Sequence, residues 1–374
     1  MAKKIILAFI IFNSFIVIFF AIFSFIKYRQ VVVKVNQDPI TRNITPTTTP
    51  TPDPNRPFAI ALMGYGGGVH EGGTLTDSIL VAQFVPSEKI IKLISIPRDL
   101  WIPIPVSIGI TKMSKINSAY TIGLDDKRYP DKEIQFTGAA GGGQMAKTIL
   151  SQVLGISIDN FITINFSGFI KTIDTLGGID VYVQKTFTDP FYPIEEKTND
   201  LCDKSPEEIT ALTATVSASK LEQYFPCRYE TLHFDKGLQH MDSITALKFV
   251  RSRHSPEDGG DFNRSARQKL VIEAIKKKII SLNFIPKLIQ FTNSLAGNLT
   301  TDIDLDQMQK LISRADEFQT YKIESFPVTD KNFLIDSISF DKQYILIPKL
   351  GENNWTDIQN FIKQPTATSS SNLD

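Results

Sequence analysis

Residues 90–99 read Ile-Ile-Lys-Leu-Ile-Ser-Ile-Pro-Arg-Asp, an apolar run that ends in a proline and a pair of opposite charges. A short apolar run bounded by turn-forming residues predicts a buried strand. In open α/β sheets, ligands lie outside the carboxyl ends of the strands. The pair Arg98-Asp99 therefore marks a candidate binding site, although a structural ion pair explains it equally well.

Similar runs on both sides of this stretch predict further strands and helices. Strands are expected at residues 58–63, 78–84, 161–165, 179–183 and 344–348. Helices are expected at residues 143–154, 167–176, 242–250 and 261–280. Because strands alternate with helices, we expect an α/β fold in which helices cover both faces of a sheet.

The composition is that of a globular protein with a sizeable core. The chain has 374 residues, of which 42% are hydrophobic, and its 40 basic residues balance its 40 acidic ones. A balanced charge produces no broad positive field, so we expect no nucleic acid partner. Any site for an anion must be local.

The N-terminal region carries an apolar run of 22 residues, Ile5 to Ile26. About 20 helical residues cross the hydrocarbon core of a bilayer, so residues 5–26 predict a transmembrane helix. The alternative is a cleaved signal peptide, whose apolar region is shorter, roughly 7–15 residues. Lysines and arginines flank both ends of the run, so charge does not settle its orientation.

Two segments are of low complexity. Residues 36–57 contain six prolines and six threonines, which favour an extended linker over a packed core. We expect this linker to hold a folded domain away from a bilayer. Residues 365–374 form a second such segment, a disordered tail.

The two cysteines, Cys202 and Cys227, both fall in a polar, irregular stretch. If the domain lies outside the membrane, a disulfide between them is permitted. Two separate buried thiols are nearly as consistent with the sequence. The spacing is not that of a zinc site.

A glycine-rich segment, residues 64–73, follows the first predicted strand. Such a turn can present backbone N–H groups to a phosphate. It lacks the Walker and dinucleotide-binding spacings, and a flexible loop is the simpler reading.

Further arginines gather at two helix ends. Arg251 and Arg253 follow one predicted helix, and their side chains can converge if that helix ends there. Asp261 is a good N-cap for the next helix, on which Arg264 and Gln268 share a face. Cations near a helix N-terminus oppose the macrodipole, which suggests a bound anion; ordinary salt bridges are the alternative.

The candidate residues are rich in arginine and carboxylate, and the chain has four histidines. Guanidinium groups match phosphate oxygens in pairs and stay charged. This composition suits phosphoryl transfer, in which positioning and charge neutralisation do most of the catalysis.

Seven sequence blocks, in order, resemble the signature blocks of the LytR-CpsA-Psr family. The blocks are Thr76-Asp-Ser-Ile79, Leu93-Ile-Ser-Ile-Pro-Arg-Asp-Leu100, Lys115-Ile-Asn-Ser-Ala-Tyr120, Asp174-Thr-Leu-Gly-Gly-Ile-Asp-Val181, Leu238-Gln-His-Met-Asp-Ser-Ile-Thr-Ala-Leu247, Val250-Arg-Ser-Arg253 and Asp261-Phe-Asn-Arg-Ser-Ala-Arg-Gln268. The resemblance implies a catalytic domain over residues 58–282. Residues 283–362 are then expected to be a C-terminal extension packed on the same fold.

The resemblance implies an α/β/α sandwich with a mixed central sheet and a hydrophobic pocket for a polyprenyl chain. It implies a single-pass protein of the bacterial cell membrane, with a cytoplasmic N-terminus and an extracytoplasmic catalytic domain. Such enzymes transfer a glycopolymer with its linking phosphate from polyprenyl diphosphate to a peptidoglycan hydroxyl and release polyprenyl phosphate. Membrane lipid, peptidoglycan and the lipid-linked polymer are thus the expected partners.

The resemblance also assigns roles to residues. Arg98, Asp99 and Asp77 are expected at the catalytic centre. Contacts to the diphosphate are expected from Arg251, Arg253, Arg264, Gln268, Asp261 and Lys115.

Asp77 is also the expected ligand of Mg²⁺. A second metal-binding aspartate, usual in a Gly-x-Asp pattern, is missing, because the chain reads Gly64-Tyr65-Gly66. Glu71 or His70 could replace it, and Mg²⁺ prefers the oxygen ligand.

Two other functions fit the same residues. Water in place of the sugar hydroxyl would make the protein a polyprenyl diphosphate-sugar hydrolase. A non-catalytic wall-binding module is the second alternative, although binding alone does not need the whole arginine set.

Overall fold

The computed structural model describes residues 28–36, 53, 55–68, 72–216, 218–281 and 295–364. The chain divides into two compact units, which we call unit 1 (residues 1–172 and 280–374) and unit 2 (residues 173–279). No such division is evident in the sequence, because unit 2 is one continuous insertion with the same mixture of strands and helices. The expected boundary at residue 282 remains a prediction.

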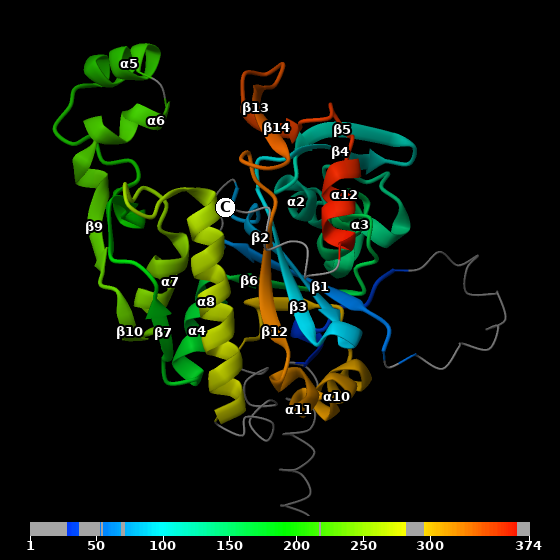
Figure 1. The fold of residues 1–374 in the computed structure, drawn as a ribbon. Coiled ribbons are helices and arrows are strands. Elements are labelled where there is room, and N and C mark those ends of the chain that lie inside the picture. Colours follow the sequence, from blue (N-terminus) through cyan, green and yellow to red (C-terminus); the bar gives the residue numbers. More distant parts are fainter. Residues whose placement is uncertain are drawn as a thin grey trace, which may run out of the picture. The chain divides into compact units, whose positions relative to one another are not determined.

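Unit 1 is built on a mixed sheet of six described strands in the order β11-β6-β1-β2-β3-β12 (Figure 1). The strands are β1 (Phe58–Tyr65), β2 (Thr76–Val85), β3 (Ile90–Ile96), β6 (Asn160–Asn165), β11 (Leu299–Thr301) and β12 (Lys322–Pro327). The pairs β1–β6 and β3–β12 are parallel, whereas β1–β2, β2–β3 and β6–β11 are antiparallel. The expected mixed α/β fold with a mixed central sheet is thus confirmed.

Strand β3 lies inside this sheet, and all seven of its residues are buried. Burial on both faces explains why residues 90–96 read as a continuous apolar run rather than an alternating one. The buried Lys92 donates to the carbonyl oxygens of Ile362 and Gln364 at 3.0 and 2.8 Å, so its ammonium group is hydrogen-bonded.

The helices of unit 1 are α2 (Ser118–Leu124), α3 (Gly141–Leu154), α10 (Leu305–Ser313), α11 (Ala315–Gln319) and α12 (Thr356–Lys363), with α4 (Phe166–Thr175) beginning in this unit. The glycines that open α3 allow close packing: a Cβ at Gly143 would lie 2.2 Å from the Phe161 ring of β6, and one at Gly141 would lie 2.4 Å from the Phe136 carbonyl oxygen. Helix α3 ends at Gly155 in the left-handed region (φ 64°), as expected from the sequence.

Within its described residues, unit 1 also carries two hairpins and three short 3₁₀ turns. The hairpins are β4–β5 (Trp101–Ser107 and Ile110–Lys115) and β13–β14 (Leu334–Ile338 and Tyr344–Pro348). The turns are η2 (Pro86–Glu88), η3 (Ile134–Phe136) and η4 (Gly138–Ala140). Both hairpins lie at the opposite end of unit 1 from α10 and α11 (Figure 1).

Unit 2 contains two strand pairs, β7–β10 (Ile179–Val183 and Gly237–Met241) and β8–β9 (Phe187–Pro193 and Tyr229–Phe234). Its helices are α5 (Pro206–Thr215), α6 (Ala218–Leu221), α7 (Ser243–Arg251) and α8 (Gly260–Ser281), with 3₁₀ turns η5 (Glu195–Lys197), η6 (Glu222–Tyr224) and η7 (Pro226–Arg228). Aromatic rings form part of the core, with Phe234 5.1 Å from both Phe187 and Phe249.

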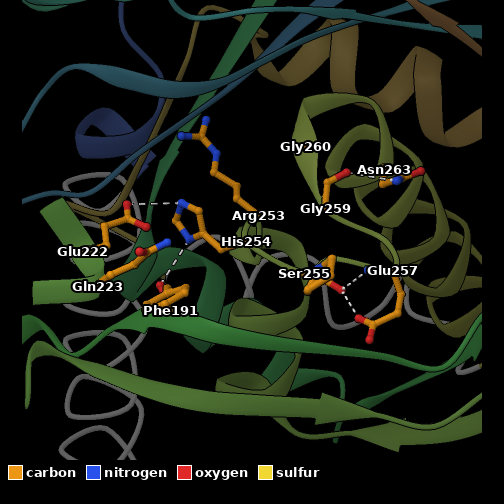
Figure 2. Close-up of a pocket in the computed structure, with 11 residues that line it drawn as sticks. Phe191, Glu222, Gln223, Arg253, His254, Ser255, Glu257, Gly259, Gly260 and Asn263 are labelled. Atoms are coloured by element: carbon orange, nitrogen blue, oxygen red, sulfur yellow. Dashed lines mark hydrogen bonds and ion pairs between the residues drawn. The ribbon is translucent and has the colours of Figure 1, made fainter. Parts of the chain in front are cut away.

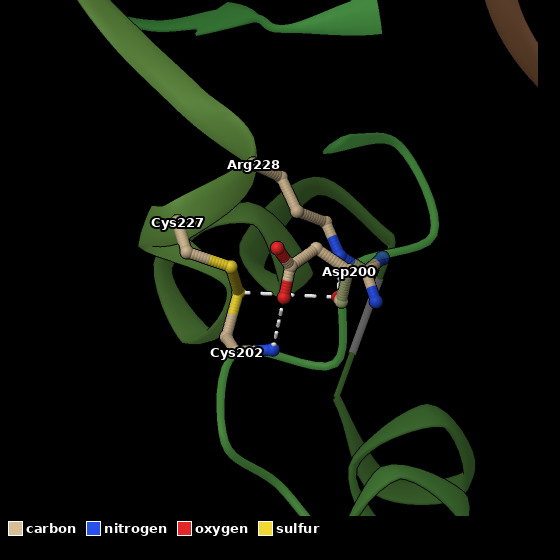
Figure 3. The surroundings of a disulfide bond; sticks show 4 residues. All are labelled: Asp200, Cys202, Cys227 and Arg228. Carbon is tan, nitrogen blue, oxygen red and sulfur yellow. Dashed lines mark hydrogen bonds between the residues drawn. A yellow bond between two sulfur atoms is a disulfide. The ribbon is translucent and has the colours of Figure 1, made fainter. Parts of the chain in front are cut away.

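The long connection between β8 and β9, residues 194–228, is closed by a disulfide between Cys202 and Cys227, whose Cα atoms lie 5.6 Å apart (Figure 3). We call this connection the excursion. The sequence left a disulfide and two separate thiols open, and the structure decides for the disulfide. Arg228 donates to the Asp200 carbonyl oxygen at 2.7 Å next to it.

Several expectations fall outside the described residues. They are the transmembrane helix at 5–26, most of the linker at 36–57, the tail at 365–374, and the metal-ligand candidates His70 and Glu71. Among the described helices, none combines the length and apolar character needed to cross a bilayer.

Candidate functional site

The first group of candidate residues lies where β2 begins and β3 ends in unit 1. These strands are antiparallel, with Ile79 opposite Ile96. The register therefore brings Asp77, the second residue of β2, next to Arg98, two residues after β3. The Pro97 turn directs the chain from β3 into β4, and Arg98 and Asp99 lie within it.

Four charged side chains form a continuous row there. Arg98 Nη1 lies 2.5 Å from Asp77 Oδ1, and Arg98 Nε lies 3.5 Å from Asp99 Oδ2. Lys115 Nζ lies 2.7 Å from Asp99 Oδ1. We call Asp77, Arg98, Asp99 and Lys115 the charged row. The structure thus brings together four of the candidate residues of unit 1; the other two, His70 and Glu71, lie outside the described residues.

Backbone hydrogen bonds fix the segments that carry the charged row. Ile116 N–H donates to the Leu100 carbonyl at 2.8 Å, and Asn117 N–H donates to the Arg98 carbonyl at 3.3 Å. Leu346 N–H of β14 donates to the Asp99 carbonyl at 3.0 Å. The backbone is therefore held on two sides while the side chains stay accessible, with 34% of Arg98 and 44% of Asp77 exposed.

A tyrosine pair lies beside Gly66, the position at which the family resemblance implies a second aspartate. The rings of Tyr65 and Tyr120 are 5.6 Å apart, and the Tyr120 and Thr163 hydroxyls are 3.1 Å apart. Burial, followed by the neighbouring Tyr120, raises the pKa of Tyr65 to about 12. Tyr65 is therefore neutral at physiological pH and cannot replace the missing carboxylate.

The described residues around Asp77 therefore offer few ligands to a metal ion. Within the described ranges, the only group of three potential metal ligands is Asp200 with Cys202 and Cys227, and those cysteines form the disulfide. Mg²⁺ in phosphate-handling sites often uses only one or two carboxylates and takes its other ligands from substrate and water. The site fits Mg²⁺ in that mode alone, with Asp77 as the protein ligand.

The second group of candidates lies in unit 2, where α7 ends. Asp242 caps this helix by accepting from Thr245 N–H at 2.7 Å, and Ser252 leaves helical geometry. The helix thus ends at Arg251, one residue later than expected. Arg251 Nη1 lies 2.9 Å from Glu195 Oε1, and its guanidinium is 5.5 Å from the Tyr192 ring centre.

Asp189 of β8 fixes the segment that follows α7. This fully buried carboxylate accepts from the Ser252 hydroxyl at 2.6 Å and from the N–H groups of Arg253 and His254 at 2.9 and 3.1 Å. Burial favours its neutral form, but these hydrogen bonds outweigh burial and hold the pKa of Asp189 below its ordinary value. Sequence reasoning missed Asp189, because nothing in strand β8 distinguishes it.

Arg267 of α8 has a structural role. Its Nε donates to the Phe249 carbonyl at 3.1 Å, and Nη2 donates to the Ser252 carbonyl at 2.5 Å. Nη1 donates to the carbonyl and the carboxylate of Asp258 at 2.7 and 2.6 Å. The guanidinium is 4.8 Å from the Phe187 ring centre, and 3% of the side chain is exposed. Arg267 therefore fastens α7, the 252–258 segment and α8 together.

The other α8 candidates are placed as follows. Arg264 is buried, with 8% exposed, and Gln268 is partly buried. Helix α8 begins at Gly260, one residue earlier than expected, so Asp261 lies in its first turn and is not the N-cap. Helix ends commonly shift by one residue, because the N-cap is set by local backbone geometry as well as by residue type.

Arg253 lines a cavity of about 350 Å³ in unit 2 (Figure 2). The excursion contributes Glu222 and Gln223, and the segment after α7 contributes His254 and Ser255. No sequence motif indicated this cavity, because its two walls lie far apart along the chain.

Comparison with known proteins places the chain among related sequences. Residues 22–354 match the LytR_cpsA_psr family. The chain is 24% identical over 318 residues to the "Polyisoprenyl-teichoic acid--peptidoglycan teichoic acid transferase TagU" of Enterococcus faecalis, covering 83% of this chain and 80% of that one. It is 27% identical over 281 residues to the Bacillus subtilis transferase TagV, covering 75% of this chain and 58% of that one.

The fold is likewise similar to a solved one. The crystal structure of Bacillus subtilis TagV matches with a TM-score of 0.53 and 24% sequence identity, over 82% of this chain and 96% of that chain. At this level of identity, the match concerns the fold alone.

Proposed function

The chain belongs to the LytR_cpsA_psr family, and from this we propose that it is a phosphotransferase that attaches a glycopolymer to peptidoglycan. The donor is a polyprenyl diphosphate-linked glycan, the acceptor is a peptidoglycan hydroxyl, and polyprenyl phosphate is released. Relatives named as teichoic acid transferases support the reaction class.

The observation that carries this proposal is the charged row. It presents the Arg98 guanidinium between the carboxylates of Asp77 and Asp99, with the Lys115 ammonium on Asp99, at the carboxyl end of β3, where α/β sheets bind ligands. Exposed ion pairs contribute only about 0–1 kcal/mol, so Arg98 can exchange a carboxylate for a phosphate oxygen at little cost. Phosphoryl transfer needs this kind of positioned positive charge.

The roles within the reaction follow from the contacts. The acceptor hydroxyl attacks the sugar-linked phosphorus and forms a new P–O bond, while the bond to the polyprenyl phosphate oxygen breaks. Arg98 stabilises the negative charge on the phosphoryl oxygens. Asp99, which contacts both Arg98 and Lys115, orients these two cations.

The roles that the family resemblance assigns in unit 2 remain part of the proposal. Arg251, Arg253, Arg264, Asp261 and Gln268 are proposed to contact the diphosphate. Arg251 and Arg253 are the better supported of these, because Asp189 and the end of α7 hold their backbone in place.

Mg²⁺ is proposed as a cofactor that arrives with the diphosphate. Asp77 would hold it, and Glu71 or His70 would add a ligand. The bound ion would supply further neutralisation of phosphate charge.

The proposed location is the bacterial cell membrane. Residues 5–26 would span it once, with the N-terminus cytoplasmic and an α/β/α sandwich outside. The Cys202–Cys227 disulfide supports an extracytoplasmic catalytic domain, because disulfides persist in oxidising compartments.

The test uses the detergent-solubilised full chain with a synthetic polyprenyl diphosphate oligosaccharide and peptidoglycan fragments, with products identified by mass. Sugar phosphate joined to the wall fragment is the expected product. Free sugar phosphate alone would instead identify the hydrolase, and binding without turnover would identify a wall-binding module. Loss of product with EDTA, restored by Mg²⁺, is the expected result for the cofactor.

A further inference from the structure

The cavity of unit 2 has two walls that are far apart in sequence. One wall is Glu222 and Gln223 of the excursion with Phe191 of β8 (Figure 2). The other is the segment from Ser255 to Gly260 with Asn263 of α8. Its volume of about 350 Å³ falls in the range of roughly 300–1,000 Å³ typical of small-molecule sites.

His254 joins the two walls. Its Nε2 lies 3.4 Å from Glu222 Oε1, and its Nδ1 lies 3.2 Å from the Phe191 carbonyl oxygen. Both neighbours are acceptors, so a neutral ring donates to one of them and a protonated ring to both; in either case the ring links the segment that carries Arg253 to the wall formed by Glu222 and Phe191. His254 is therefore a positioning residue for the cavity.

The disulfide holds the excursion wall. Glu222 and Gln223 lie between Cys202 and Cys227 in the chain, just before the buried Phe225. The Arg228 guanidinium is 3.9 Å from the centre of the Phe225 ring and donates to the Asp200 carbonyl oxygen (Figure 3). The disulfide and the Arg228 contacts thus hold the backbone close to Glu222 and Gln223, which line the cavity.

The chemistry of the lining excludes two classes of ligand. The polar groups of Glu222, Gln223 and Asn263 would be desolvated by a lipid chain without compensation. The lining also has two carboxylates, Glu222 and Glu257, against the single guanidinium of Arg253, so a polyanion that fills the whole cavity is disfavoured, whereas the proposed contact of Arg253 with one phosphate is not.

What remains is an uncharged, hydroxyl-rich ring, which can belong to a larger ligand that carries its charge elsewhere. Carboxylate and amide oxygens accept from sugar hydroxyls, and amide N–H groups donate to them. Within the described chain, the Gln223 amide has no hydrogen-bond partner of its own, and the Phe191 ring offers an apolar surface. We propose that this cavity binds a sugar ring, with Gln223, Glu222 and Asn263 as its hydrogen-bonding groups.

This inference rests on the proposed function for its choice of sugars. The ring could belong to the donor, next to the diphosphate, or to the peptidoglycan acceptor. Two probes distinguish these sources: N-acetylglucosamine 1-phosphate for the donor, and the N-acetylglucosamine–N-acetylmuramic acid disaccharide for the acceptor. Affinities for the full chain are measured by calorimetry or ligand-observed NMR.

The variants are Gln223→Ala, Asn263→Ala and Glu222→Gln. Each should weaken binding of one probe by about 3–10-fold, the loss expected for one hydrogen bond. Glu207→Gln is the matched control, because it makes the same charge change on the exposed face of α5, outside the cavity. Thermal unfolding confirms that each variant is folded.

The proposal is overturned if neither probe binds the wild type, or if the three variants bind as tightly as Glu207→Gln. Turnover separates this failure from failure of the proposed function. If the variants transfer the glycopolymer as fast as the wild type, the sugar site is wrong and the transferase activity stands. If the variants weaken probe binding but the wild type shows no transfer, the transferase activity is wrong and the sugar site stands.

A second inference comes from residues 28–36, which pack on unit 1. Val31 is 1% exposed, Val32 forms a bridge with Thr301 of β11, and Val33 N–H donates to the Thr301 carbonyl at 2.9 Å. The Tyr28 hydroxyl accepts from Leu305 N–H, at the start of α10, at 3.1 Å.

The other end of this segment is also attached. Asn36 Nδ2 donates to the Thr137 hydroxyl at 3.0 Å. After the Pro/Thr-rich residues, Arg56 forms an ion pair with Asp159 at 2.7 Å, and β1 begins at Phe58. Both ends of the Pro/Thr-rich segment thus lie on unit 1.

We infer that unit 1 turns its α10 end, on which residues 28–36 are docked, towards the membrane. This rests on the proposed anchor at residues 5–26. Only Lys27 separates that run from Tyr28, so the α10 end of unit 1 faces the bilayer within about 10 Å. The β13–β14 hairpin, at the opposite end of the unit, points away from it (Figure 1).

The test places a fluorophore on the full chain in vesicles that contain acceptor-labelled lipid headgroups. Leu305→Cys and Ile338→Cys give matched labels, since both side chains are exposed, 55% and 64%. Energy transfer should be several-fold stronger from residue 305. Adding Val31→Asp, which undocks the segment, should reduce that difference.

Equal transfer from both labels would overturn this orientation of unit 1 while keeping the anchor. No transfer from either label would overturn the anchor, and the inference with it.

Discussion

Two arginines, each paired with an aspartate, behave differently in the two units. Arg98 of unit 1 is paired with Asp77 at the surface, with 34% of its side chain exposed. Arg267 of unit 2 is paired with Asp258, with 3% exposed, and its donors also bind the carbonyls of Phe249 and Ser252. In sequence both are arginines in signature blocks, but only the first can change partners without disturbing the fold.

The difference follows from solvation. An exposed pair forms and breaks at little cost, because water solvates both charges. A buried guanidinium that has lost its water must keep its protein partners. Burial lowers the pKa of Arg267, which reports the same desolvation. Arg98 is thus suited to bind a substrate anion, and Arg267 is suited to hold unit 2 together.

The largest expected effect is on activity, from Arg98→Ala. Transfer should fall by roughly 10³-fold or more, by analogy with arginines that stabilise phosphoryl transfer. Unfolding should change by no more than about 1 kcal/mol, as for other exposed pairs. Rates measured with the lipid-linked donor test the first part, and thermal melting tests the second. Full activity in this variant would contradict the role of the charged row.

Arg267→Ala should show the reverse pattern, a loss of stability of about 3–5 kcal/mol, because it leaves Asp258 and two buried carbonyls without their donor. Denaturant unfolding measures it. Lys248→Ala is the matched control in the same unit, since its pair with Glu230 is about one-third exposed and should contribute less than 1 kcal/mol. Equal losses in the free energy of unfolding for the two variants would contradict the distinction between exposed and buried ion pairs.

Replacing both cysteines with serine tests how much of the order in unit 2 comes from the disulfide. Closing a loop of this length, with a sequence separation of 25 residues, contributes about 3 kcal/mol in the chain-entropy description. We expect a loss of about that size or less, together with weaker sugar binding. The measurement is the melting temperature of the wild type with and without reductant, compared with that of the double variant. An unchanged melting temperature would show that the excursion is held by its other contacts.

The smallest expected effect is a pH dependence from Asp189. Its pKa is depressed in the folded state, so its contribution is fully present above the ordinary aspartate pKa of about 3.9 and is lost as the pH falls through the folded value. Asp189→Asn should destabilise unit 2 by about 1–3 kcal/mol at neutral pH and flatten the acid limb of the stability curve. Unfolding between pH 3 and 7 measures both. A parallel acid limb in the variant would assign the pH dependence to other groups.

Much of this could be predicted from the sequence. The strands at residues 90–96 and 179–183 have the predicted bounds. A short apolar run between turn-forming residues is too short for a buried helix, so a strand is the expected conformation. The charged row could be anticipated because Asp77, Arg98, Asp99 and Lys115 all lie in signature blocks. The end of α7 was predicted to within one residue, at Val250 instead of Arg251.

The tertiary structure decided the rest. In the sequence, nothing distinguishes Asp189 and Arg267 from the other aspartates and arginines. Residues from distant strands and helices make Asp189 a buried hydrogen-bond acceptor and Arg267 a donor that connects separate segments of unit 2. The pairing of Cys202 with Cys227, the cavity behind Glu222 and the docking of residues 28–36 likewise depend on segments far apart in sequence. Local sequence determines backbone conformation and the types of groups available, whereas burial and partner choice, which set how an ion pair behaves, arise only when the chain packs.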